Sequence, residues 1–470
     1  MDPKKYGNLN LTLLEPFKYL ARKMSLTLKE RIRSVSLIFA CGTALFSDGY
    51  SNGIISAVNT ILNRIYGADR IEAHNYGTIL RSVVFAGTIV GMLSFGWLSD
   101  KVGRKFGMMS ANAIVALFAG LSAASKGAGG ELGGMLSMLI AMRFLLGIGI
   151  GAEYPCGSVS ASEQSEEPGI SKRAQHRWFA LATNTMIDFG FVIAAFVPLV
   201  LFWIFGDNHL RAVWRLSLGL GVVPALLVFL WRLNMDEPER FKKDSMKHAR
   251  IPYWLVFKRY WVSLAAISFT WFLYDFIVYP FGLYSSIIVD RVTGGNDSLT
   301  VVLGWNVVIK LTGPGHIGAF AVVYGIFLSF GELGPGNCLG LLASKTSPTA
   351  VRGQFYGLAA AIGKVGAFVG TWAFPPMIDA FGGSDTDKGN TGPFWVGSGL
   401  AILSALVVFF FIRPLTTDGM IEEDEAFRRY LEEHGYDTSA MGLSSATSTA
   451  VETIEPEGVE KDKTGSFEKV

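Results

Sequence analysis

Ionisable side chains stand inside several long apolar stretches of this sequence. Asp48, Glu153 and Asp275 have apolar or aromatic neighbours on both sides, and Lys364 lies among alanines and glycines. A charge in such a setting is costly, so these residues are rare and usually functional. A carboxyl group held there can take up and release a proton, which makes the three acids candidates for proton transfer. For Glu153, a structural hydrogen bond or ion pair is the alternative.

The stretches that carry these residues are long enough to cross a membrane. Only 17% of the 470 residues are charged, against about 25% in ordinary soluble domains. A bilayer core about 30 Å thick needs roughly 20 apolar residues per helix. Ten segments qualify: 34–62, 76–98, 107–125, 134–159, 177–205, 211–233, 261–289, 317–343, 353–378 and 393–412. A soluble core could absorb one or two of them, so the sequence predicts an all-α integral membrane protein.

Positive charge marks the cytoplasmic side of the predicted bundle. Residues 1–33 carry eight Lys or Arg, residues 232–260 carry eight more, and Lys101, Arg104 and Lys105 crowd one short loop. The positive-inside rule places all three regions, and with them the N-terminus, in the cytoplasm. The long, acidic and polar C-terminal tail is expected there too. Topology accounts for the positive charge, so binding of nucleic acid is not expected.

Metal chemistry and enzymatic catalysis are not expected either. The three cysteines lie in apolar stretches, and the six histidines lie in loops, in tails or at a span boundary. The sequence holds no nucleophile–base arrangement, metal-binding cluster or phosphate-cradling loop. We therefore expect no enzyme, no metal and no cofactor.

The basic loop near the middle of the chain separates two predicted helix bundles. The expected parts are a cytoplasmic segment 1–33, an N-terminal bundle 34–233, a cytoplasmic loop 234–260, a C-terminal bundle 261–413 and a cytoplasmic, largely disordered tail 414–470. Within the tail, Glu422 to Glu433 is typical of a short charged helix that ends near Gly435.

One region is too short for its predicted topology. The span 261–289 should end outside and the span 317–343 should start outside, because the tail is cytoplasmic. Residues 291–316 must then begin and end outside, yet their apolar run 299–309 is too short to cross even once. We infer that one and a half helices, on the order of 50 residues, are missing near 299–316.

A cytoplasmic loop motif carries a resemblance to a known family. Residues 96–105 read GWLSDKVGRK, which resembles the signature loop between the second and third helices of the major facilitator superfamily. Gly96 and Gly103 permit a tight turn, while Asp100 and Arg104 lie at the cytoplasmic surface. Arg143 of the fourth helix is expected to join this gating network. The resemblance implies two six-helix bundles, here without the end of the eighth helix and the ninth.

The fourth helix narrows the resemblance to one branch. Residues 143–155 read RFLLGIGIGAEYP, similar to the phosphate:proton symporters, which have Asp where this chain has Glu153. The longer GAEYPCGS at 151–158 and the tail motif EDEAFRRYLEEHGYDTS resemble the fungal permeases for glycerophosphoinositol and glycerophosphocholine. Gly147 and Gly151 are four residues apart and should let another helix approach closely.

The resemblance also implies which side chains handle protons and substrate. Asp48, Glu153 and Asp275 would couple protons. Lys364 would bind the phosphate anion, and an ion pair with Asp275 or Asp188 is its alternative role. The other candidates for substrate binding are Tyr154, Trp271, Tyr279, Asn337, Asn184 and Asp188.

Helical spacing groups several of these candidates. Trp271, Asp275 and Tyr279 are four residues apart, so they share one helix face. Asn184 and Asp188 do the same on the fifth helix, where phosphate carriers have an amide-bearing pattern.

One departure from the branch concerns the cytoplasmic side. After the tenth helix the branch has Gly-Glu-Val-Phe-Pro, whereas residues 343–348 read ASKTSP. An acid is lost, so the cytoplasmic lock is expected to differ.

The leading expectation is a monomeric, proton-coupled symporter of the plasma membrane that imports a glycerophosphodiester by alternating access. Its partners would be the small anionic phosphodiester, protons and the lipid bilayer. Two alternatives stay open: an inorganic phosphate:proton symporter, and a non-transporting or defective truncated paralogue or sensor.

Overall fold

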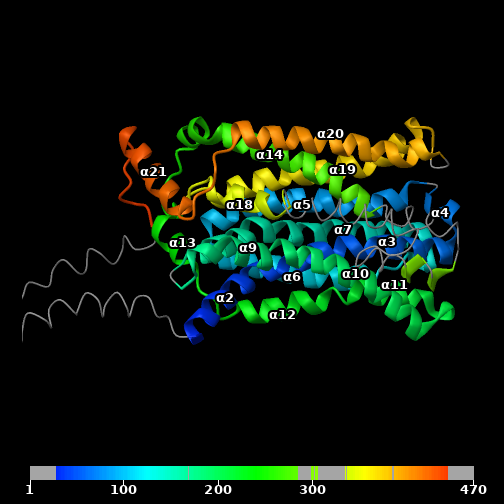
Figure 1. Ribbon diagram of the computed structural model, residues 1–470. Coiled ribbons are helices and arrows are strands. Elements are labelled where there is room, and N and C mark those ends of the chain that lie inside the picture. Colours follow the sequence, from blue (N-terminus) through cyan, green and yellow to red (C-terminus); the bar gives the residue numbers. More distant parts are fainter. Residues whose placement is uncertain are drawn as a thin grey trace, which may run out of the picture.

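The computed structural model describes residues 28–72, 74–167, 169–283, 298–300, 302–304, 334, 336–383 and 386–442. The regular structure within these ranges is helical, and the long helices run side by side along one axis (Figure 1).

The N-terminal bundle extends from residue 28 to residue 232. Its helices are α2 (Leu28–Gly42), α3 (Phe46–Tyr66), α4 (Ala68–Glu72), α5 (Tyr76–Lys101), α6 (Arg104–Ala123), α7 (Leu132–Glu153), α8 (Val159–Ser165), α9 (Gln175–Ala182), α10 (Asn184–Phe205), α11 (Leu210–Gly219) and α12 (Val222–Arg232). A 3-10 turn, Thr43–Leu45, separates α2 from α3, and a π-helix, Tyr154–Ser158, joins α7 to α8. Pro155 lies in the π-helix, where its missing N–H favours a wider turn.

Glycines set the spacing between α5 and α7. A Cβ at Gly147 would meet the Val84 carbonyl oxygen at 2.3 Å, and one at Gly151 would meet the Thr88 carbonyl oxygen at 2.2 Å. The predicted close helix approach at these two glycines is therefore confirmed, and the partner is α5. Without side chains in between, the two backbones can pack directly.

The described C-terminal part is smaller. It contains α14 (Tyr253–Leu283), α18 (Asn337–Lys345), α19 (Arg352–Ala380) and α20 (Asp387–Phe411), while α13 (Glu239–Asp244) lies in the loop between the bundles and α21 (Gly419–Glu433) follows them. The last of these confirms the predicted tail helix, and Gly435 after it has a φ of 72°. Residues 443–470, 305–333 and most of the predicted gap lie outside the described residues.

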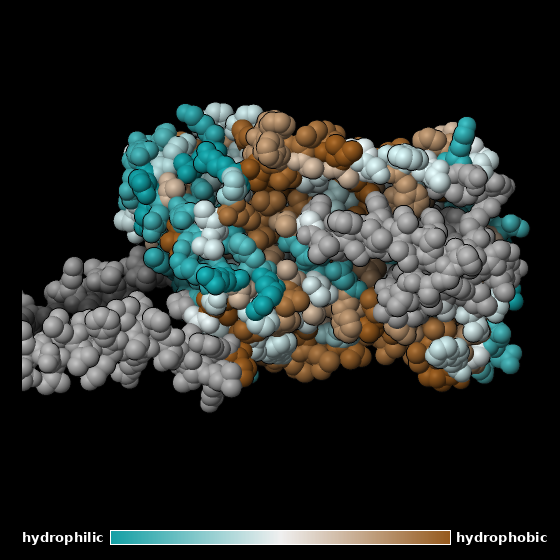
Figure 2. All heavy atoms as spheres, in the orientation of Figure 1, coloured by the Kyte–Doolittle hydropathy of each residue, from teal (hydrophilic) through white to brown (hydrophobic). Residues whose placement is uncertain are grey.

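Eight described helices are long and apolar enough to cross a membrane. Large apolar side chains are exposed on the outer surface, as the brown belt of Figure 2 shows. The predicted spans 34–62 and 317–343 are not among the eight. The first is divided between α2 and α3 and carries polar residues along α3; the second lies largely outside the described residues.

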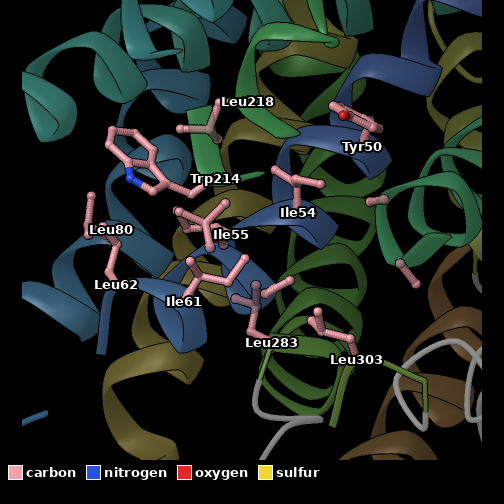
Figure 3. Packing of buried hydrophobic residues seen from close by; sticks show 14 of the residues in the cluster. Tyr50, Ile54, Ile55, Ile61, Leu62, Leu80, Trp214, Leu218, Leu283 and Leu303 are labelled. Carbon is pink, nitrogen blue, oxygen red and sulfur yellow. The ribbon is translucent and has the colours of Figure 1, made fainter. Parts of the chain in front are cut away.

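The largest core cluster lies along the outer half of α3. Figure 3 shows Ile54, Ile55 and Ile61 packed with Trp214 of α11, and Leu283 of α14 close by. The interface between the two bundles is thus packed as a core, and α5 and α14 both pack along α19.

Candidate substrate and proton site

A buried lysine of α19 lies between two carboxylates that belong to different bundles. Lys364 Nζ is 3.5 Å from Asp275 Oδ2 on α14 and 3.7 Å from Asp48 Oδ2 on α3. All three side chains are almost fully buried. Charges in this setting are tolerated because each has an opposite charge beside it.

Two tyrosines and an asparagine complete the contacts of Asp48. The hydroxyl groups of Tyr154 and Tyr279 donate to Asp48 Oδ2 at 2.6 and 3.1 Å. Asn52 Nδ2 donates to Asp48 Oδ1 at 2.7 Å. Lys364 Nζ in turn donates to the Tyr279 hydroxyl and lies 3.9 Å from the centre of that ring. The structure therefore brings four of the predicted site residues, Asp48, Tyr154, Tyr279 and Lys364, into one hydrogen-bonded cluster, and the ion pair with Lys364 adds Asp275.

Small residues and a helix irregularity place these groups. A Cβ at Gly363 would meet Trp271 Cδ1 at 2.5 Å, and one at Gly366 would meet the Phe272 carbonyl oxygen at 2.2 Å. This close approach of α19 to α14 puts Lys364 within reach of the acid on α14. Tyr154 opens the π-helix, whose wider turn changes the direction in which the following side chains point.

Aromatic rings surround the charged groups. The Trp271 ring centre is 6.5 Å from that of Tyr154 and 5.4 Å from that of Tyr356. Phe85 of α5 packs edge-on against Tyr279 at 5.0 Å. This arrangement gives Lys364 a low-dielectric setting in which a small change of charge has a large energetic effect.

The charge balance of the cluster defines what it can do. One ammonium group and two ionised carboxylates leave one net negative charge. A proton on either carboxyl group removes that charge and leaves Lys364 with one carboxylate fewer to compensate it. A ligand anion could then replace that carboxylate as the partner of Lys364. The net charge of the cluster would then equal its charge before the proton was added.

Three further candidates lie on α10 and α18. Asn184 and Asp188 are half-buried on α10, and Asn337 is half-buried at the start of α18. The Ile187 carbonyl oxygen lies where a Cβ on Gly49 would stand, so α10 contacts α3 directly beside the cluster. Among the described residues, no group of His, Cys, Asp and Glu side chains could hold a metal ion.

Glu153 lies outside the lysine cluster and has its own cation. Its carboxylate pairs with Arg232 at the end of α12, at 2.7 and 2.9 Å. Arg232 also donates to the carbonyl oxygens of Ala40, Cys41 and Met108. This is the ion pair that the sequence left open as the alternative role of Glu153, and it connects α7, α12, α2 and α6 within one bundle.

The predicted cytoplasmic motif forms contacts across the two bundles. Arg104 pairs with Asp100 at 2.6 Å and with Glu163 at 3.3 Å, and Glu163 pairs with Arg352 of α19 at 3.1 Å. Asp100 also accepts from the Gly353 N–H at 2.9 Å, at the N-terminus of α19. A carboxylate there is favoured by the orphan N–H groups and the helix dipole. The ends of the two bundles at the signature loop, which the sequence predicts to be cytoplasmic, are thus bonded to each other.

Both glycines of the motif are sterically required. Gly96 packs against α19, where a Cβ would meet the Gly353 carbonyl oxygen at 3.0 Å. Gly103 has a φ of 143°, which favours glycine. The Glu237 carboxylate accepts from the Arg104 and Lys105 N–H groups at 3.0 and 3.2 Å, next to this turn. Burial raises the pKa of the Glu237 carboxyl group, and these N–H donors oppose that rise.

Arg143 does not belong to the cytoplasmic network, and that prediction is wrong. It lies midway along α7 and donates to the carbonyl oxygens of Leu80 and Ser51, at 3.3 and 3.0 Å. Leu80 belongs to the end of α5 opposite the signature loop. The prediction grouped Arg143 with other basic residues by type and ignored its position along α7, which rises about 1.5 Å per residue.

Asp424, an acid on α21, was not among the predicted site residues. Asp424 accepts from the Thr349 N–H at 2.6 Å and from the Thr349 hydroxyl at 2.8 Å. It also pairs with Arg240 at 3.4 Å and Arg352 at 3.5 Å. The loop before α19, which lacks the acid of the related branch, therefore contacts a carboxylate from the tail. This contact is how the cytoplasmic lock differs from that of the branch. The signal that could have revealed this contact is the one face of the charged tail helix that is buried, which includes Phe427.

Hydroxyl pairs link the bundles between the lysine cluster and the charged network. Ser158 and Tyr356 are 2.7 Å apart, and Ser162 and Ser344 are 2.9 Å apart. Together with Tyr154, the two serines are spaced by four along the fourth span. One side of that span thus carries contacts to the other bundle from the cluster to the cytoplasm.

Comparisons with known proteins agree with this fold and this site. The pattern of the sugar (and other) transporter family matches residues 35–250 and 298–427. The fold is also that of a solved proton:xylose symporter, with a TM-score of 0.66 and 16% identity over 85% of this chain and all of the other. The chain therefore belongs to the sugar (and other) transporter family of the major facilitator superfamily. It is a multi-pass membrane protein and not an enzyme, and the predicted fold class is confirmed.

Its curated relatives include fungal permeases. A glycerophosphocholine permease of Candida albicans is 43% identical over 94% of this chain and 90% of its own length. A major glycerophosphoinositol permease of the same organism is 40% identical over 92% and 88%. An inorganic phosphate transporter of rice is more distant, at 27% identity over 72% and 82%. The predicted resemblance to the glycerophosphodiester permeases is confirmed.

The alignments also measure what the chain lacks. The first covers 486 positions but takes in 94% of the 470 residues here, roughly 440, so about 45 positions have no counterpart in this chain. The second covers 475 positions and 92% of the chain, which leaves nearly the same shortfall. This size agrees with the missing segment that the topology predicted.

Proposed function

We propose that the protein imports a glycerophosphodiester across the plasma membrane together with protons, by alternating access. The observation that supports it best is Lys364, buried between a carboxylate of each bundle. The relatives that are named permeases of glycerophosphocholine and glycerophosphoinositol support the substrate class. A phosphodiester carries one negative charge, which matches the single ammonium group.

In this proposal a proton and the substrate replace existing contacts of Lys364. Protonation of Asp48 or Asp275 weakens its hold on the ammonium group, and the phosphodiester oxygens take that place. Tyr154 and Tyr279 can donate to the same anion, because both hydroxyl groups already donate to a carboxylate. Asn184, Asp188 and Asn337 are proposed to contact the hydroxyl groups of the headgroup.

Transport then requires the two bundles to rock about this cluster. The cytoplasmic contacts between Asp100, Glu163 and the start of α19 must break for release to the cytoplasm. Substrate binding neutralises the attraction between Lys364 and Asp48, which is one of the forces that hold the bundles together. Differential binding to the two states is what drives such a shift.

The test is uptake of labelled glycerophosphocholine and glycerophosphoinositol into cells that express the protein, with inorganic phosphate as competitor. Lys364→Ala should lower uptake per molecule at the surface by about 100-fold or more, because the anion loses its cation. Lys388→Ala, at an exposed position of α20, is the control and should be unchanged. Full uptake by Lys364→Ala would contradict the proposal, and strong competition by phosphate would favour the phosphate alternative.

A further inference from the structure

A file of polar side chains follows one face of α3 outward from the lysine cluster. Its members are Asp48, Asn52, Ser56, Asn59 and Asn63, at offsets of 4, 8, 11 and 15 residues from the first. At 100° per residue these offsets fall within about 80° of the helix circumference, so all five share one face. The rest of this helix is mainly apolar and packs into the core.

The file contains buried oxygen atoms without protein partners. Within the described part of the chain, nothing donates to or accepts from Asn52 Oδ1, Ser56 Oγ, Asn59 Oδ1 or Asn63 Oδ1. The side chains of Asn52, Ser56 and Asn59 are 0%, 6% and 1% exposed. A buried polar atom left unpaired costs about 1–3 kcal/mol. Four such atoms on one face require hydrogen-bond partners, and water is the usual partner where the described residues supply none.

A cation from α7 lies beside the same face. Arg143 is fully buried, and its Nη1 has no partner among the described residues. Its other groups donate to the carbonyl oxygens of Ser51 on α3 and Leu80 on α5. Arg143 thus brings an unpaired N–H donor against α3, the helix that carries the unpaired acceptors, and ordered water can satisfy both kinds of group.

The file has an outer end and an inner end. At the outer end, Asn59 Nδ2 donates to the Gly77 carbonyl oxygen at 3.0 Å, and the carboxylate of exposed Glu72 lies against Gly77. At the inner end, Asn52 Nδ2 donates to Asp48 Oδ1 at 2.7 Å. Members four apart are separated by about 6 Å along the axis, a gap that one hydrogen-bonded water can bridge.

We propose that this file holds a chain of water molecules that carries protons from the outer face to Asp48, separately from the substrate path. The inference rests on the proposed proton coupling. A proton added at the outer end passes from water to water, and the last transfer converts the Asp48 carboxylate to the acid. The ionisable groups that contact this carboxylate are Tyr154, Tyr279 and Lys364, and Asp275 shares Lys364 with it.

Asn59→Leu tests the file because it replaces a polar member by an apolar side chain of similar size. In proteoliposomes, substrate accumulation and proton uptake driven by a pH gradient should fall at least 10-fold. Exchange of labelled for unlabelled glycerophosphocholine at equal low pH on both sides should stay within twofold. Asn59→Ser leaves room for water and should restore gradient-driven uptake. Thr60→Val is the control, because the Thr60 hydroxyl group lies outside the file and donates to a carbonyl oxygen of its own helix, that of Ser56, at 3.1 Å.

The possible outcomes distinguish failure of the proposed water chain from failure of the proposed function. Gradient-driven uptake by Asn59→Leu equal to that of the unchanged protein would overturn the file alone. Parallel loss of exchange and accumulation, unrelieved in Asn59→Ser, would also overturn it, because Asn59 would then be structural. An unchanged protein that exchanges substrate yet takes up no protons with it would overturn the proposed coupling, and the file with it.

Discussion

The two bundles differ in how completely the last helix of each is packed. In the N-terminal bundle, α11 and α12 pack on α6, and 39% of the most apolar stretch between Asp207 and Arg232 is buried. In the C-terminal bundle, α20 packs on α14 and α19, and 11% of the corresponding stretch is buried. The C-terminal bundle is the one in which the topology predicts the missing segment.

The bundles also differ in where their buried charges find partners. Glu153 is paired with Arg232 inside the N-terminal bundle, whereas Asp48 of the same bundle is paired with Lys364 of the other. Pairs within a bundle hold its helices together in every state. Pairs between bundles exist only while the bundles are apposed. This difference predicts that ion pairs within a bundle determine stability, whereas ion pairs between bundles determine conformational change.

The strongest test of this distinction is Arg232→Met. The substitution leaves Glu153 buried without its cation, and breaking such a pair costs about 3–5 kcal/mol. We expect a markedly lower melting temperature of the purified protein and a loss of surface protein. Arg173→Met, at an exposed position, is the control. Adding Glu153→Gln should recover part of the loss, since no bare charge then remains.

An Arg232→Met protein as stable as the original would show that the pair does not hold the bundle together. Glu153 would then return as a candidate for proton coupling, as the sequence first suggested.

The contrast between the two acids also shows what the sequence can predict. Span lengths and glycine spacing predicted the membrane bundle and a close helix contact at Gly147 and Gly151, because both depend on neighbours along the chain; the partner helix, α5, came from the structure. The lysine cluster could be assembled because resemblance to a family supplied the pairing of distant helices. The partner of Glu153 could not be found in this way, since Arg232 is 79 residues away and stands where a cytoplasmic boundary charge is expected. Asp424 was hidden for the same reason: the sequence predicts the helix that carries it, but not which distant residues that helix contacts.

A second test removes a charge where the tail meets the bundles: Asp424 contacts Thr349 and Arg352 of the C-terminal bundle and Arg240 of the loop between the bundles. Asp424→Asn keeps the shape of the side chain and weakens its bonds to Thr349 and Arg352, which should cost the closed cytoplasmic side about 1–3 kcal/mol. A cysteine reporter, Ser162→Cys in a Cys338→Ser background, should then be labelled from the cytoplasm about 10-fold faster. Melting temperature should change little, in contrast to Arg232→Met. Glu433→Gln, at an exposed position of α21, is the control.

Unchanged labelling together with a lowered melting temperature would assign Asp424 to stability and would break the distinction between the two kinds of pair.

The smallest expected effect concerns the neutral contact between bundles nearest to the cluster. Ser158→Ala removes one hydroxyl group from the Ser158–Tyr356 pair, and a net hydrogen bond contributes about 0.5–1.5 kcal/mol. The cytoplasmic side should open more often, so labelling of the same reporter should rise by a factor of about 2–10. Tyr356→Phe should match it, and the double variant should add little, because both remove the same bond. Ser160→Ala is the matched control, since Ser160 donates within its own helix to the Cys156 carbonyl oxygen. Equal labelling of Ser158→Ala and Ser160→Ala would mean that the hydroxyl pair does not restrain the bundles, and that the charged network alone keeps the cytoplasmic side closed.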